Sequence, residues 1–231
     1  MCNQGDHMLK DKRIRIIIGH YGSGKTEFAV NYAVKLAQMG QKVALGDLDI
    51  VNPYFRSREK QTMLEDLGVK VIGSNIKDSL GSDLPAVAAS ILAPLQDESY
   101  QVLLDVGGDA VGARALGRYH AYFQSGNYDM FCVLNANRPG TQDVAGALEH
   151  LRSIEAVARA PVTGLVNNTH LLRETTLEDV LRGQKLAEQV SDKLNIPIKY
   201  VSALEEISKQ IPKNLEGEIF PIKMYMREDW M

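Results

Sequence analysis

The sequence has few cysteines, little net charge and no long hydrophobic run, and each absence excludes a class of protein. Two cysteines in 231 residues, Cys2 and Cys132, argue against a disulfide framework. A formal net charge of −3 gives no general attraction to nucleic acid or to anionic membranes. No apolar run approaches the roughly 18 residues of a membrane-spanning helix, and the N-terminus lacks the apolar core of a signal peptide. We therefore expect a cytoplasmic protein, and the sequence disfavours nucleic-acid binding and stable membrane binding.

Short apolar segments alternate with amphipathic stretches of helical length along most of the chain. This alternation predicts an α/β fold with three layers, in which helices cover both faces of a doubly wound, mainly parallel sheet. Residues 1–12 are polar and are expected to be disordered, and residues 13–231 are expected to form a single domain. The expected strands are Arg13–Ile18, Lys42–Leu45, Lys70–Gly73, Val102–Asp105, Met130–Leu134, Val162–Asn167 and Ile198–Val201.

A glycine-rich motif between the first expected strand and helix carries most of the functional information. The segment from Gly19 to Thr26 fits G-x-x-x-x-G-K-[ST], the pattern of a loop that binds the phosphates of a nucleoside triphosphate. Its backbone N–H groups and the helix N-terminus attract the anion, Lys25 is expected to reach the β- and γ-phosphates, and the Thr26 hydroxyl is expected to bind Mg²⁺. The predicted nucleotide-binding residues here are Gly19, His20, Tyr21, Gly22, Ser23, Gly24, Lys25, Thr26 and Glu27.

Two aspartates follow the second expected strand. Asp47 and Asp49 lie where open α/β sheets bind their ligands, and paired carboxylates could serve Mg²⁺ and an attacking water. We predict that Lys25, Asp47 and Asp49 are catalytic. The alternative is a turn in which the aspartate side chains accept hydrogen bonds from nearby backbone N–H groups.

A third site follows the strand at residues 102–105. An apolar strand that ends in an aspartate is the Walker B arrangement, so Asp105 is predicted to join Thr26 and Asp47 around Mg²⁺. Gly108 is predicted to approach the γ-phosphate and to allow the following loop to move. Asp109 is better explained as a helix cap, because a helical pattern runs over residues 110–120.

The base-binding residue is expected at the end of a later strand. The Asn168 amide offers a donor and an acceptor to a purine, and the guanine-reading pattern N-K-x-D is absent from the segment Asn167–His170, which favours adenine. The segment Val201–Ala203 is similar to a guanine-loop serine–alanine element, so GTP stays open as an alternative.

At these places the chain resembles the MinD/ParA division of P-loop NTPases. The resemblance implies a Mg-ATP site, a water-activating carboxylate at Asp49, a metal-shell aspartate at Asp47 or Asp105, and an adenine-reading Asn168. Members of that division usually carry a signature lysine that reaches the phosphates of a partner subunit, and His20 stands in its place here. Three arginines near the expected switch segments could replace that charge, namely Arg56, Arg114 and Arg118.

Two classes of function agree with these observations. The first is a slow ATPase that acts as a nucleotide-driven switch for an unidentified protein partner. The second is a metabolic enzyme, a small-molecule kinase or ligase similar to dethiobiotin synthetase. Residues 219–226 alternate apolar side chains around a proline and are expected to be extended, covering the sheet or a neighbouring subunit. On this basis we predict a homodimer that does not depend on nucleotide.

Overall fold

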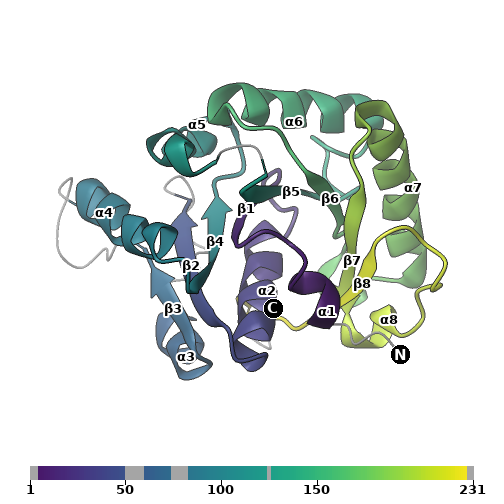
Figure 1. Cartoon of the computed structure of the whole chain (residues 1–231). Helices are drawn as coiled ribbons and strands as arrows, with labels where there is room; N and C mark the ends of the chain where they lie inside the picture. Colours follow the sequence, from purple (N-terminus) through teal and green to yellow (C-terminus); the bar gives the residue numbers. More distant parts are fainter. Residues whose placement is uncertain (1–4, 50–59, 74–82, 124–125, 228–231) are drawn as a thin grey trace.

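A computed structural model describes residues 5–49, 60–73, 83–123 and 126–227. Its centre is an eight-stranded sheet in the order β3-β2-β4-β1-β5-β6-β7-β8 (Figure 1), and every neighbouring pair is parallel. The predicted α/β, doubly wound fold is therefore confirmed. The strands are β1 (Ile14–Ile18), β2 (Lys42–Leu48), β3 (Val69–Ile72), β4 (Tyr100–Val106), β5 (Tyr128–Leu134), β6 (Gly164–Asn167), β7 (Ile198–Leu204) and β8 (Glu218–Ile222).

Helices cover both faces of the sheet, and each face has its own hydrophobic core. The helices are α1 (Gly5–Met8), α2 (Lys25–Gln38), α3 (Gln61–Asp66), α4 (Asp83–Gln96), α5 (Ala110–Ala113), α6 (Val144–Ala158), α7 (Leu177–Leu194) and α8 (Glu205–Ser208), with 3₁₀ turns η2 (Arg114–Tyr122) and η3 (Leu172–Glu174). Side chains of α2 and α3 pack on one face, and those of α4, η2, α6 and α7 pack on the other (Figure 1). Strand β1 contributes Ile16 and Ile18 to one core and Ile17 to the other, which explains its uninterrupted apolar run.

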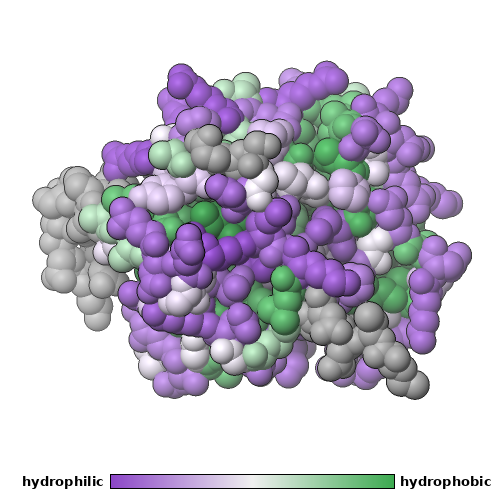
Figure 2. All heavy atoms as spheres, in the orientation of Figure 1, coloured by the Kyte–Doolittle hydropathy of each residue, from purple (hydrophilic) through white to green (hydrophobic). Residues whose placement is uncertain are grey.

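The surface seen in Figure 2 is largely hydrophilic, with separate small hydrophobic areas. Among the described residues, the exposed large hydrophobic side chains are Leu9, Tyr21, Val111 and Leu171. No helix in the described part of the chain is both long and apolar enough to span a membrane.

Side chains cap the starts of α5 and α7. Thr176 and Asp179 form a capping box at the start of α7. The Asp109 carboxylate accepts a hydrogen bond from the Gly112 N–H at 2.7 Å, so Asp109 caps α5 as expected. The helix predicted over residues 110–120 is shorter, because the chain passes from α5 into η2 after Ala113.

The N-terminal segment differs from its predicted disorder, because residues 5–12 fold against the sheet. Met8 is buried, and the Asp11 carboxylate accepts hydrogen bonds from the hydroxyls of Tyr32 and Tyr200. Asp11 also pairs with the Lys199 ammonium at 2.6 Å. The fully buried Arg15 of β1 donates to the carbonyl oxygens of Met8 and Asp11. One buried polar residue, Asp11, therefore holds this segment to the sheet, and composition alone does not distinguish it from the exposed polar residues around it.

The segment expected to be extended forms the eighth strand and continues beyond it. Strand β8 is at the edge of the sheet, where Pro221 can replace a residue with an N–H group. The side chains of Phe220, Ile222 and Met226 are buried against the α2 core. These apolar side chains therefore pack against other residues of this chain.

Candidate nucleotide site

The glycine motif forms a closed loop between β1 and α2. Gly22 and Gly24 have φ angles of 77° and 81°, a region that side chains disfavour. The Ser23 N–H donates to the His20 carbonyl oxygen at 2.9 Å, and Ser23, Lys25 and Thr26 are buried. The loop therefore has the backbone shape that its sequence predicts, and α2 begins directly at Lys25.

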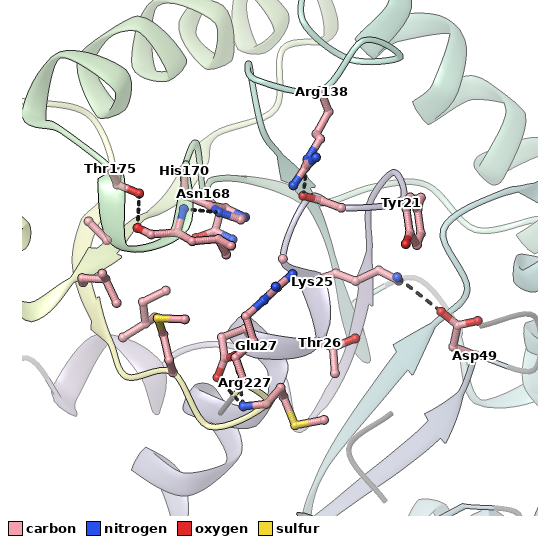
Figure 3. A pocket seen from close by; sticks show the side chains of 18 residues that line it. Tyr21, Lys25, Thr26, Glu27, Asp49, Arg138, Asn168, His170, Thr175 and Arg227 are labelled. Atoms are coloured by element: carbon pink, nitrogen blue, oxygen red, sulfur yellow. Dashed lines mark hydrogen bonds and ion pairs between the residues drawn. The ribbon is translucent and has the colours of Figure 1, made fainter. Parts of the chain in front are cut away.

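Lys25 points across the site to Asp49 (Figure 3). The Lys25 Nζ lies 3.3 Å from Asp49 Oδ2, and the two side chains are 7% and 8% exposed. Charges this deeply buried are stabilised mainly by groups of the protein, since water contributes little to their stabilisation. The phosphate-binding lysine and the predicted catalytic carboxylate are therefore in direct contact.

The predicted metal-binding residues also come together. Asp47 and Asp105 are register partners on β2 and β4, and Thr26 Oγ1 donates to Asp105 Oδ2 at 2.7 Å. Burial, and secondarily the nearby charges of Asp47 and Asp49, raise the pKa of Asp105 to about 7, although Lys25 and the Thr26 hydroxyl oppose this. A cation bound beside Asp105 would favour its ionised form.

These residues fit a magnesium ion. Asp105 Oδ1 is buried and accepts no hydrogen bond, and Thr26 and Asp47 supply further oxygen atoms beside it. No group of three histidine, cysteine or acidic side chains in the described residues forms a complete metal cage. Magnesium commonly binds through one or two carboxylates together with water and phosphate oxygens, so such a cage is not required.

The turn alternative for the aspartate pair is also realised in part. The Asp49 N–H donates to Asp47 Oδ1 at 3.1 Å, which is the local hydrogen bond of an aspartate turn. This bond fixes the Asp47 side chain relative to the backbone that carries Asp49, so the turn helps to form the site.

Gly108, which was predicted to approach the γ-phosphate, lies against the glycine-rich loop at residues 19–26, called the phosphate loop below. A Cβ atom at Gly108 would come within 2.8 Å of the Tyr21 nitrogen, so a side chain there would collide with the loop backbone. The segment that follows β4 therefore touches the phosphate loop directly, which is the contact that a nucleotide-sensing segment needs.

Asn168 ties the phosphate loop to β7. Its Nδ2 donates to the Ser23 carbonyl oxygen at 2.8 Å, and its Oδ1 accepts from the Ser202 hydroxyl at 2.6 Å. The side chain is buried at the inner wall of the cavity. An amide nitrogen has two N–H groups, so Asn168 can hold the loop and still donate to a ring nitrogen of a base.

A cavity of about 290 Å³ extends from the phosphate loop to the end of the sheet (Figure 3). Its phosphate side includes Gly22, Lys25 and Thr26, and its far side is mostly apolar. The far side is formed by Leu172, Thr175, Ala203, Leu204, Ile222, Met224 and Met226, together with Arg227. This division into a polar and an apolar end suits a nucleotide, whose base is flat and largely apolar.

Sequence reasoning missed much of the cavity lining, including Arg138 and His170, which are both held by Asn135. The buried Asn135 donates to the Gly22 carbonyl oxygen at 3.3 Å and accepts from the His170 N–H at 3.4 Å. Arg138 Nε donates to the same Gly22 oxygen at 2.9 Å, which brings a cation to the loop. Burial, and secondarily Arg138 and Arg227, lower the pKa of His170 to about 4, so its imidazole is neutral. Arg138 and His170 each follow shortly after the end of a strand, β5 or β6, and this position was the signal in the sequence that could have identified them.

His20 and Glu27 were both predicted to bind nucleotide, but both make contacts with other parts of the protein. The His20 ring packs edge-on against His150, with the ring centres 5.3 Å apart, and His20 is not among the cavity-lining residues. Glu27 lines the cavity, but its carboxylate accepts hydrogen bonds from the backbone N–H groups of Tyr225 and Met226. Burial raises the pKa of Glu27 to about 6, and these two hydrogen bonds offset part of the increase.

Two of the three candidate replacement arginines lie in the described part of the chain, and neither lines this cavity. Arg114 and Arg118 lie in η2 and are exposed, and the cavity lining includes neither. Arg56 lies outside the described residues. Arg138 is the arginine that contacts the phosphate loop through a hydrogen bond.

Similar proteins agree with the fold. FtsY from Mycoplasma mycoides is 20% identical with a TM-score of 0.55, and the match covers 82% of this chain and 60% of FtsY. FtsY from Elizabethkingia anophelis in complex with GDP is 21% identical with a TM-score of 0.53, covering 85% and 62% of the two chains. A nucleotide-binding protein from Archaeoglobus fulgidus in complex with ADP is 17% identical with a TM-score of 0.50, covering 89% and 88%.

The chain thus spans about 60% of the length of these FtsY proteins, and at such identities the likeness concerns the fold alone. No curated protein matches the sequence. The model of the CobQ/CobB/MinD/ParA nucleotide binding domain matches residues 14–212, which is most of the chain. The protein therefore belongs to the CobQ/CobB/MinD/ParA nucleotide-binding domain family.

Proposed function

We propose that this protein binds Mg-ATP, hydrolyses it slowly and acts as a nucleotide-driven switch for a protein partner. The observation that carries the proposal is the buried contact between Lys25 and Asp49, 3.3 Å apart beside Thr26 and Asp105. It places a cation for phosphate next to a carboxylate that can orient or deprotonate water. Membership of the family supports nucleotide binding, and the ATP, the magnesium and the partner are our inference.

Each residue has a distinct part in the proposed reaction. Phosphate oxygens would draw Lys25 away from Asp49, since the phosphate group carries more negative charge than one carboxylate. Asp49, once released from Lys25, would accept a proton from the attacking water or hold that water in line. Magnesium would be held by Thr26, Asp47 and Asp105, and when bound it neutralises the charge that develops on the phosphates.

The base preference is inferred from Asn168 and from what the sequence lacks. A donor at Asn168 suits ring nitrogen N7, which adenine and guanine share, so this contact favours purines in general. The missing N-K-x-D pattern favours ATP over GTP, and GTP is the alternative base. The similar structures include a complex with GDP and a complex with ADP, so they support neither choice.

The test of nucleotide binding is calorimetry of Lys25→Ala with Mg-ATP. One charge-assisted phosphate contact contributes about 1.5–3 kcal/mol, so we expect the affinity to fall by at least tenfold. Lys185→Ala is the matched control, because Lys185 is an exposed lysine of α7 far from the cavity lining. Unchanged affinity in Lys25→Ala would refute the assignment of the site.

Measurements of ATP turnover distinguish a switch from a metabolic enzyme. A switch should hydrolyse ATP slowly alone and faster with a protein fraction of a cell extract. An enzyme similar to dethiobiotin synthetase should turn over only with the small-molecule fraction. The second result would replace the switch by a metabolic kinase or ligase.

A further inference from the structure

The residues that follow β8 form one wall of the nucleotide cavity. After Ile222 the chain runs along the first half of α2, and Met224, Met226 and Arg227 line the cavity opposite His170 (Figure 3). Met226 is buried in the same core as α2. Met224 and Met226 add apolar surface to the cavity lining, which suits the base of a nucleotide, and Arg227 adds a cation.

Two polar side chains of α2 hold this segment through its backbone, and a third holds β8 just before it. Asn31 donates to the Lys223 carbonyl oxygen at 2.7 Å and accepts from the Lys223 N–H at 2.7 Å, as a neighbouring strand would. Glu27 accepts from the N–H groups of Tyr225 at 2.6 Å and Met226 at 3.1 Å. Lys35 donates to the carbonyl oxygen of Pro221 at 2.6 Å. The three residues are four apart, so they share one face of the helix.

This arrangement joins the two ends of the cavity through a single helix. Glu27 directly follows Thr26, and both are in the first turn of α2, which starts at the phosphate loop. Asn31 is 3% exposed and lies one turn further along. Any shift of α2 that accompanies phosphate binding is therefore passed to the segment at residues 223–227, and the reverse also holds.

We propose that Glu27 and Asn31 are positioning residues that hold residues 223–227 as the base-side wall, so that nucleotide binding and docking of this segment stabilise each other. The proposal rests on the nucleotide site described above. Coupling of this kind is reciprocal: if the docked segment improves nucleotide affinity, nucleotide improves docking by the same factor. The C-terminal segment would then report whether the site is occupied.

The first test compares a ligand that has a base with one that has none. A chain ending at Lys223, Glu27→Ala and Asn31→Ala are each titrated with Mg-ATP and with Mg-tripolyphosphate. We expect ATP affinity to fall about tenfold in the shortened chain and severalfold in the point variants, while tripolyphosphate affinity stays within twofold. Gln38→Ala is the control, because Gln38 is an exposed residue of the same helix that does not line this cavity.

The outcome separates positioning from other roles. If both ligands weaken together, Glu27 and Asn31 support the phosphate loop, and the proposal is wrong. It is also wrong if the wild type binds ATP and the variants bind it equally well, a result that leaves the proposed function intact. A wild-type protein that binds neither ligand would overturn the proposed function and this inference together.

The second test measures docking directly by limited trypsin digestion. Trypsin cuts after Lys223, at the point where the segment leaves β8, and after the exposed Lys213, which does not line the nucleotide cavity. Saturating Mg-ATP should slow cleavage after Lys223 by about the same factor by which shortening the chain weakens ATP binding. Cleavage after Lys213 should not change. Equal rates after Lys223 with and without Mg-ATP would refute the coupling.

Discussion

Replacing Asp49 by asparagine should destabilise the nucleotide-free protein and at the same time increase its response to nucleotide. In the structure Lys25 and Asp49 are 3.3 Å apart and almost fully buried. Removing one charge of such a pair costs about 3–5 kcal/mol when the other charge is left without compensation. Asparagine keeps a polar oxygen near Lys25, so we expect a loss of about 2–3 kcal/mol. For a chain of this size that loss lowers Tm by about 5–10 °C.

Mg-ATP should restore this loss, because its phosphates supply the negative charge that Lys25 has lost. The nucleotide-induced rise in Tm should therefore be larger in Asp49→Asn than in the wild type, and ATP affinity should be equal or up to about tenfold higher. Turnover should fall by about 10²-fold or more, the usual contribution of a positioned base. Thermal unfolding with and without Mg-ATP and a phosphate-release assay measure these quantities.

Asp192→Asn is the control for Asp49→Asn, since Asp192 is an exposed acid of α7. It should change neither the Tm nor the turnover. Wild-type turnover in Asp49→Asn would show that Asp49 is structural. An unchanged response of Tm to nucleotide would show that Lys25 does not leave Asp49 for phosphate, and either result would refute the reasoning.

Three further predictions concern the base, the pH dependence and the assembly. ATP should bind severalfold more tightly than GTP, and Asn168→Ala should weaken the binding of both nucleotides, because N7 is common to the two bases; a competition assay in which GTP wins would reverse the preference. Burial, and secondarily the nearby Asp11, raise the pKa of Glu218 to about 7. The stability that its neutral carboxyl contributes is therefore fully present below about pH 4.5 and is lost as the pH rises through 7. The Tm difference between Glu218→Gln and the wild type should therefore be a few degrees more favourable to the variant at pH 8 than at pH 5. Curves of Tm against pH that run parallel for the two proteins would contradict this. The apolar side chains behind the expected homodimer are buried within this chain, and His20 replaces the signature lysine, so we predict that the mass measured by light scattering is the same with and without ATP; dimerisation on adding ATP would show that another cation reaches across.

The phosphate side of the site could be predicted because its information is local. Glycine spacing fixes the loop, and the parallel sheet brings the ends of β2 and β4 side by side, so Asp47 and Asp105 meet without any detailed knowledge of packing. Hydrophobic runs likewise located the central strands. The predicted boundaries shifted by a few residues, as for β5, which starts at Tyr128 rather than at Met130.

The base side could not be predicted, because it depends on contacts between distant segments. Asn31 and Lys223 are 192 positions apart and meet through a side chain and a backbone, a pairing that leaves no periodic pattern. Arg138 and His170 lie in loops without a motif, and their position depends on the buried Asn135 between them. Glu27 was predicted to bind nucleotide because it directly follows the glycine-rich motif, but its carboxylate accepts a hydrogen bond from Tyr225, near the end of the described chain.

The contacts of Arg15 decide where the protein can be shortened at its N-terminus. A chain starting at Arg13 would keep all eight strands and the whole nucleotide cavity. It would nevertheless remove the carbonyl oxygens of Met8 and Asp11, leaving a fully buried guanidinium short of two acceptors, and Lys199 would lose its carboxylate partner. The smallest stable unit therefore begins before the first residue of the sheet, and a truncation chosen from hydrophobicity alone would be made in the wrong place.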